Sequence, residues 1–339
     1  MTHIVPVEKF QGCLMGLGLG DTLCAANEGG LIERFLWRII GRTKNGLHRY
    51  TDDTQMTIDL AAHLVNNGSI NQDVLARDFA INYKWSRGYG PNRAFVLNKI
   101  KADIDWRTAS TSKYSSGSFG NGAAMRISVV ALFFHNRQKE LSDAIEQSAS
   151  ITHPNSLAIT GAALIAQAVI HGLYDTEPAS AIRSMIVGCK SEAFLIRMTF
   201  VHECLLVGDI PDPVRLRQTL GTGTSAIDSC PASILIGMYY RLHPIENLLG
   251  YVNKCKGDTS IVHQPPRWKM ALVTWFGVWP TVYVVSNLAR SHVSGWPSFL
   301  AAGFVTFLVV LALAWGVMPT LTRLLRPWLL GSADIPRRE

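Results

Sequence analysis

The most restrictive feature of this sequence is a stretch near its C-terminal end, 270–318, in which Arg290 is the sole formally charged residue. Two apolar segments lie within it, at 270–289 and 298–318, and each is long enough to cross a bilayer core of about 30 Å as a helix. Tryptophans gather in this region, several near the expected interfaces, as in the aromatic belts of membrane proteins. Two buried core helices are the alternative, but the short connection between the segments favours a two-helix transmembrane hairpin.

Basic residues flank the predicted hairpin on its two outer sides, and Arg290 is the one basic residue in the connecting turn. The positive-inside rule therefore places the preceding domain and both termini in the cytoplasm, with membrane lipid as a partner. We expect a domain at 1–262, a linker at 263–269 and a basic cytoplasmic tail at 319–339. The flanking basic residues are Lys254, Lys256, Arg267 and Lys269 before the hairpin, and Arg323, Arg326, Arg337 and Arg338 after it.

Composition limits the classes open to the remaining chain. Charged residues make up 17% of the sequence, against about 25% in a typical soluble protein, and the nearly uncharged hairpin accounts for part of this deficit. The net charge of +7 is modest, and +4 of it falls in the segment from Lys269 onward, so no nucleic-acid partner is expected. The six cysteines form no close pair and no metal-ligand spacing, and they are typical of reduced thiols in a cytosolic domain. The N-terminus lacks the pattern of a secretory signal peptide.

Helical periodicity dominates the first 268 residues, and alternation typical of strands is scarce. Asn, Asp, Ser, Gly or Pro bound most of the periodic stretches, as expected of helix ends. The sequence therefore predicts an all-α domain followed by a transmembrane hairpin. The predicted helices are Thr54–Val65, Gln72–Tyr83, Ala123–Phe134, Leu141–Ala149, Leu157–Gly172, Glu192–Val207 and Pro231–Tyr240.

Two polar clusters interrupt the predicted helices in the first quarter of the chain. In GLGLGDTLCAANE, Asp21 and Glu28 bracket a helix rich in glycine. The glycines indicate that another group approaches this backbone closely, and tight packing against a second helix is the favoured explanation. The second cluster is TDDT at 51–54, directly before an amphipathic run. One helix cap needs one such residue, whereas a hydroxyl and two carboxylates also suit Mg²⁺ or Mn²⁺. A cap and a metal site both remain open here.

Two further clusters lie near the middle of the chain. SSGSFGNGAAMR at 115–126 places small residues before a helix whose free amides could hold a phosphate, although a surface loop is the commoner explanation. ITHPN at 151–155 places His153 at a helix junction. A single histidine is more often structural than functional, so His153 gains weight as one member of a set.

The ordered set resembles a known family. G-x-G-D-x-L…E, T-D-D-T-x-M, G-N-G-A-A-M-R and T-H-P-N in this order resemble the ADP-ribosylglycohydrolase family, the group that contains dinitrogenase-reductase-activating glycohydrolase. The resemblance covers roughly 8–260, and the combination is far more specific than any one motif. It implies an all-α fold with two Mg²⁺ or Mn²⁺ ions at the bottom of an ADP-ribose cleft.

The resemblance also implies roles for individual residues. Glu28 and Asp53 are the expected catalytic residues, with Glu28 near the metals as ligand, gate or proton acceptor. Asp21 matches an acidic position of the family pattern, and holding the first helix in place is its alternative role. The expected metal ligands are Thr51, Asp52, Asp53 and Asp258, and the expected substrate-binding residues are Gly120, Asn121, Gly122 and His153.

The last metal motif departs from the family pattern. The family ends its site with G-G-D-T-D-T and a helix of small residues, whereas this chain reads KGDTSIV at 256–262 and continues to PPRW. Ser260 replaces the second aspartate and Ile261 the second threonine. Because ligand charge sets the affinity of oxygen-only sites, we expect one of the two metal sites to be impaired. The tail resembles a two-span unit attached to some antibiotic-biosynthesis-monooxygenase-like proteins.

Two functions remain in view. The first is metal-dependent hydrolysis of the N-glycosidic bond of ADP-ribosylated protein side chains, with arginine the commonest acceptor in the family, by an enzyme tethered to the membrane. The second is a catalytically impaired ADP-ribose-binding or structural module on a membrane anchor. The intact TDDT, GNGAAMR and TH motifs favour the enzyme, and the altered last motif favours the module. Either function has ADP-ribose or an ADP-ribosylated protein as partner.

Overall fold

The computed structural model describes residues 4–27, 37, 40–257, 281–289, 293, 296–313, 317 and 320. The chain divides into two compact units, 1–257 and 258–339. Within the described residues of the first unit, helices and turns make up the structure, apart from two isolated β-bridges. The prediction of an all-α domain is confirmed.

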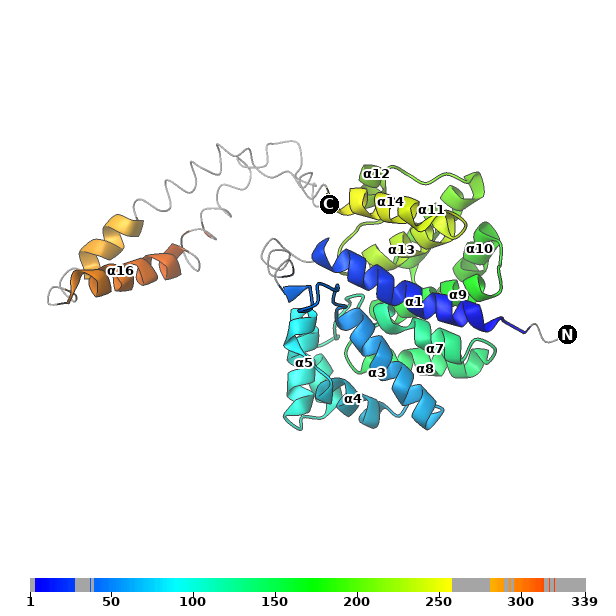
Figure 1. Ribbon diagram of the computed structural model, residues 1–339, viewed down its shortest axis with the longest axis horizontal. Helices are drawn as coiled ribbons and strands as arrows, with labels where there is room; N and C mark the ends of the chain where they lie inside the picture. The colour runs from blue at the N-terminus through cyan, green and yellow to red at the C-terminus, as the bar shows by residue number, and fades with distance from the viewer. Residues whose placement is uncertain are drawn as a thin grey trace. The chain divides into compact units, whose positions relative to one another are not determined.

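The first unit is built from thirteen described α-helices and three short 3₁₀ helices. Figure 1 labels most of the α-helices and colours the chain from its N-terminus to its C-terminus. The 3₁₀ helices are η1 (Ala25–Asn27), η2 (Trp85–Arg87) and η3 (Ala124–Arg126). The α-helices are α1 (Val7–Cys24), α3 (Asp52–Asn67), α4 (Gln72–Ile81), α5 (Pro91–Lys101), α6 (Trp106–Thr111), α7 (Ser128–Phe133), α8 (Gln138–Ser150), α9 (Ser156–Leu173), α10 (Pro178–Gly188), α11 (Glu192–Val207), α12 (Pro213–Thr219), α13 (Ala226–Tyr240) and α14 (Ile245–Gly257).

Side-chain caps explain why several helices begin where they do. Asn71 accepts a hydrogen bond from the amide of the third residue of α4, and Asn155 caps α9 in a similar way. Each side chain satisfies an amide that has no partner within its helix. Helix α13 begins at Ala226, five residues before the predicted start at Pro231. Ser225 caps it, and Pro231 lies inside the helix, where it removes one backbone hydrogen bond.

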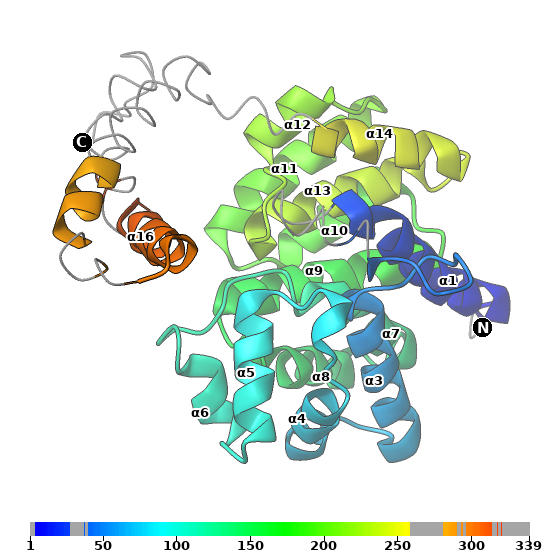
Figure 2. The same cartoon turned by 60° about the vertical axis from the view of Figure 1, so that its left-hand side comes forward.

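Helix α9 is the centre of the first unit. It packs against α13 on one side and against α7 and α8 on the other, and Figures 1 and 2 show it between these groups. Small residues let α9 and α13 approach closely, because a Cβ at Gly161 would lie 2.9 Å from both Ala226 Cβ and Cys230 Sγ. The loops that precede α9 and α13 are therefore held side by side, and both contribute to the site described below.

Among the described helices, α9 alone is long and apolar enough to span a membrane. Its contacts with α7, α8 and α13 identify it as the core helix of the first unit. In the second unit, residues 281–289 are helical and α16 covers Ser298–Ala312. Helix α16 is apolar and exposes Leu300, Phe307 and Val310. The remainder of the predicted spans lies outside the described residues, so the transmembrane hairpin stays a prediction.

Candidate functional site

The TDDT cluster forms the N-terminus of α3, where Thr51 is the N-cap. Thr51 Oγ1 accepts a hydrogen bond from the Asp53 amide at 3.3 Å. The buried carboxylate of Asp21, on α1, accepts from the Thr51 amide at 2.9 Å, from the Thr51 hydroxyl at 2.6 Å and from the Thr54 amide at 3.1 Å. Asp21 therefore holds the start of α3 against α1, which is a structural role.

The two aspartates of the cluster differ in their surroundings. Asp52 is buried, and its Oδ2 lies 2.8 Å from Nη2 of Arg93 on α5. Asp53 is half-buried at the same helix end. Carboxylates are favoured there because the helix dipole is positive at its N-terminus. Thr51 thus caps α3 while Asp52 and Asp53 place two carboxylates at the same helix end. The sequence motifs do not indicate the ion pair between Asp52 and Arg93.

The glycine-rich loop is attached to the start of α13. Gly120 and Ser225 form an isolated antiparallel bridge, and the Asn121 amide donates to the Thr224 carbonyl at 2.9 Å. The Ala226 amide in turn donates to the carbonyl of Phe119 at 3.0 Å. These bonds fix the backbone of the loop while leaving Asn121 half-buried.

Gly122 brings three distant segments together. A Cβ at this position would lie 2.4 Å from His153 Cε1 and 3.0 Å from Arg93 Cδ, so only glycine fits here without displacing the ring. A Cβ at Gly120 would lie 3.5 Å from His153 Nε2. The loop therefore rests on the imidazole and on the stem of Arg93, which reaches Asp52. Four of the predicted site residues, Asp52, Gly120, Gly122 and His153, belong to one connected cluster.

His153 is held as a neutral imidazole. Its side chain is buried, and Nδ1 lies 2.8 Å from the Thr152 hydroxyl, while Nε2 faces Gly120. Burial lowers the pKa of His153 well below its ordinary value, and the positive charges of Arg126 and Arg93 lower it further. A neutral ring adds no positive charge to a cluster that already contains Arg93 and Arg126.

Arg126 supports this cluster from behind and is fully buried. Its Nη1 donates to the Gly122 carbonyl at 2.7 Å, and its Nη2 donates to the Ser148 carbonyl at 3.0 Å and to Thr152 Oγ1 at 2.9 Å. Burial lowers the pKa of Arg126 to about 9, with a further contribution from Arg93. Sequence reasoning places Arg126 in the GNGAAMR motif but gives it no role. A charged residue directly before the apolar run of α7 is the sequence feature that could have indicated a buried, hydrogen-bonded arginine.

The donor chemistry at the start of α3 partly fits a divalent cation. A threonine hydroxyl and two carboxylates are hard oxygen ligands of the kind that Mg²⁺ or Mn²⁺ prefers. However, no group of three acidic, histidine or cysteine side chains suited to a metal ion occurs within the described ranges. The predicted residues Glu28 and Asp258 lie outside the described residues. The carboxylate of Asp52 is already paired with Arg93.

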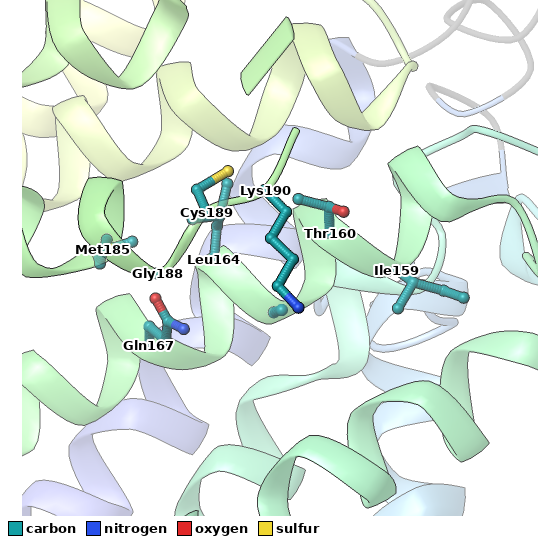
Figure 3. A pocket seen from close by; sticks show the side chains of 9 residues that line it. Ile159, Thr160, Leu164, Gln167, Met185, Gly188, Cys189 and Lys190 are labelled. Carbon is teal, nitrogen blue, oxygen red and sulfur yellow. The ribbon is translucent and has the colours of Figure 1, made fainter. Parts of the chain in front are cut away.

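A surface pocket lies elsewhere on the first unit, between α9 and the segment that follows α10. Figure 3 shows the Lys190 amine projecting across it, with Thr160 and Gln167 also on its wall. Its volume is about 200 Å³. None of the residues predicted for the site lines this pocket.

Comparison with known proteins identifies relatives along the chain. The chain is similar to a Gallus gallus protein named ADP-ribosylhydrolase ARH3, with 28% identity over 68% of this chain and 72% of the relative. A Danio rerio protein of the same name is 28% identical over 76% of this chain and 80% of the relative. An uncharacterised Synechococcus elongatus protein is 41% identical over 24% of this chain and 38% of the relative.

Two sequence models match the chain, one after the other. Residues 264–329 match the Y2318 C-terminal domain, and the comparisons give no support to the resemblance with monooxygenase-associated membrane units. Residues 2–262 match the ADP-ribosylglycohydrolase model, and this match covers well over half of the chain. The chain therefore belongs to the ADP-ribosylglycohydrolase family.

Proposed function

We propose that the first unit binds the ADP-ribose portion of an ADP-ribosylated protein and hydrolyses its N-glycosidic bond, with arginine as the acceptor residue. The observation that supports this most is the meeting of the glycine-rich loop, His153 and Asp52 around Gly122. These residues come from three segments far apart in the chain, and each matches a motif of the family. The relatives named ADP-ribosylhydrolase support the same substrate class.

The cluster supplies distinct functions for the reaction. Backbone at 120–122 lies against the substrate, and the neutral imidazole of His153 offers Nε2 to its hydroxyls or phosphates. Water attacks the anomeric carbon, the carbon–nitrogen bond breaks, and the leaving guanidine nitrogen takes a proton. Glu28 or Asp53 accepts the proton that the attacking water loses. A Mg²⁺ or Mn²⁺ ion held by Thr51, Asp53 and Asp258 would supply Lewis-acid activation of this water.

We also propose that the second unit tethers this activity to the cytoplasmic face of a membrane. The support is the near absence of charge in 270–318 and the exposed apolar side chains of α16. The expected result is that the full chain stays in the membrane pellet after an alkaline carbonate wash. Release of the chain into the supernatant contradicts the tether.

The activity is tested by incubating the detergent-solubilised full chain with a protein carrying ADP-ribosyl-arginine, in the presence of Mn²⁺. We expect release of free ADP-ribose, reduced at least 100-fold by Asp53→Asn. Asp143→Asn removes an exposed carboxylate on α8 and should leave the release unchanged.

One observation favours a second candidate function, a binding module without turnover. Asp52, a predicted metal ligand, is paired with Arg93 inside the protein, and this pairing opposes a second metal ion. A module would bind ADP-ribose but release none from the modified protein. The same assay, accompanied by a binding measurement, separates the two functions.

A further inference from the structure

Arg93 and Asp52 form a buried ion pair at the centre of the site. Arg93 Nη2 and Asp52 Oδ2 are 2.8 Å apart, and the two side chains are 14% and 4% exposed. Water screens a pair this deep only weakly, so its attraction is strong and its separation is costly. Asp52 thus already has a positive charge beside its carboxylate.

The surroundings of Arg93 hold its guanidinium in this position. Its Cδ lies 3.0 Å from the place that a Cβ would take at Gly122, and Nη2 lies 3.5 Å from the equivalent place at Gly90. Its Nη1 also contacts the sulfur of Met125. The side chain is therefore packed against Gly90, Met125 and the loop at 120–122. Arg93 is therefore part of the folded site and unlike a mobile surface arginine.

The charge of Arg93 acts on the rest of the cluster. It contributes to the lowered pKa of both Arg126 and His153. A divalent cation bound to Asp52 would stand within a few ångströms of the guanidinium, and the repulsion between them would oppose binding. The sequence also indicates weaker binding of a second divalent ion, since Ser260 stands where the family pattern has an aspartate.

We propose that Arg93 is the resident cation of Asp52 and takes the place of one of the two divalent ions. The site then holds at most one ion, on the side of Thr51 and Asp53. This inference rests on the proposed function for a metal site at the start of α3, and on the family resemblance for Asp52 as one of its ligands. It goes further because it assigns a role to Arg93, which is not a predicted ligand: Arg93 competes with a divalent ion for the carboxylate of Asp52.

The test measures Mn²⁺ binding to the detergent-solubilised full chain by calorimetry, with free Mn²⁺ followed by electron paramagnetic resonance. Arg93→Met keeps an apolar stem and removes the charge. We expect the wild type to bind no more than one ion, and Arg93→Met to bind one more ion or to bind Mn²⁺ at least tenfold more tightly. Lys101→Met removes an exposed charge from the same helix and should behave as the wild type.

Two further variants keep the test valid if Arg93→Met is poorly folded. Arg93→Lys retains the charge and should bind Mn²⁺ as weakly as the wild type. Arg93→Met combined with Asp52→Asn removes both charges and should abolish the gain in Mn²⁺ binding. Two tightly bound ions in the wild type, or equal affinity in the wild type and Arg93→Met, would overturn the inference. Because Mn²⁺ occupancy is the readout, a chain that releases no ADP-ribose still gives a decisive answer.

Discussion

Replacing Asp59 with asparagine should change how the stability of the protein depends on pH. Asp59 lies on α3, two turns after Asp52, and is 6% exposed. Its Oδ1 accepts hydrogen bonds from Gln55 Nε2 at 3.1 Å and from Asn82 Nδ2 at 2.9 Å. Its Oδ2 is buried without a hydrogen-bond partner within the part of the chain that the structure describes. Burial is the main reason that the pKa of Asp59 rises from 3.8 to about 6, and the charge of Asp78 adds to the rise.

The sign and size of the effect follow from this shift. The folded state binds the Asp59 proton more tightly than the unfolded state does. Protonated Asp59 therefore contributes its full stabilisation below pH 3.8, and this stabilisation is lost as the pH rises through about 6. At about 1.4 kcal/mol per pKa unit, the full loss is about 3 kcal/mol, of which about 1 kcal/mol is already incurred at pH 4.5. The amide of the Asp59→Asn variant cannot ionise, so the variant avoids this loss.

The assay is urea unfolding of wild type and Asp59→Asn at pH 4.5 and pH 7.5, followed by circular dichroism. We expect the difference in unfolding free energy between the two proteins to move by about 1–2 kcal/mol in favour of the variant at the higher pH. The matched control, Asp143→Asn, should show no such movement. A difference that stays constant with pH for Asp59→Asn would refute the reasoning, because Asp59 would then titrate alike in both states.

Two further predictions concern the framework of the site. Asp21→Asn should lower the unfolding free energy by about 2 kcal/mol in the same urea assay, because the carboxylate that accepts hydrogen bonds from Thr51 and Thr54 is lost. An unchanged urea midpoint would contradict the role of Asp21 in holding α1 against α3. Gly122→Ala should cost about 1–3 kcal/mol because its methyl group collides with the buried imidazole, whereas Gly172→Ala, in open space on α9, should be neutral or stabilising. Equal effects of the two alanines would contradict the packing described here.

The features predicted from the sequence are those that depend on residues close together in the chain. Helices α4 and α9 follow from local periodicity and from the asparagine caps Asn71 and Asn155, whereas α11 is a long and predominantly apolar segment. Helix α5 is not among the predicted helices, because its apolar residues show little helical periodicity around Arg93.

The site is predicted less completely, for a physical reason. The motif resemblance selects Asp52, Gly122 and His153, and the structure brings these residues together. The ion pair of Arg93 with Asp52 and the buried bonds of Arg126 join residues that are far apart in sequence. Spacing along the chain carries no signal for such contacts, so they emerge only from the packing of α3, α5 and the glycine-rich loop.

The most direct test of the account is calorimetric titration of ADP-ribose into the full chain, with Gly120→Ala as the decisive variant. A methyl group at this position would meet its neighbours at 3.4–3.5 Å, so the fold should survive while the loop gains bulk directly beside His153 Nε2. We predict that the wild type and Gly172→Ala bind one ADP-ribose, and that Gly120→Ala binds it at least tenfold more weakly. An absence of binding to the wild type, or equal binding to Gly120→Ala, would contradict the placement of the ADP-ribose site around Gly122.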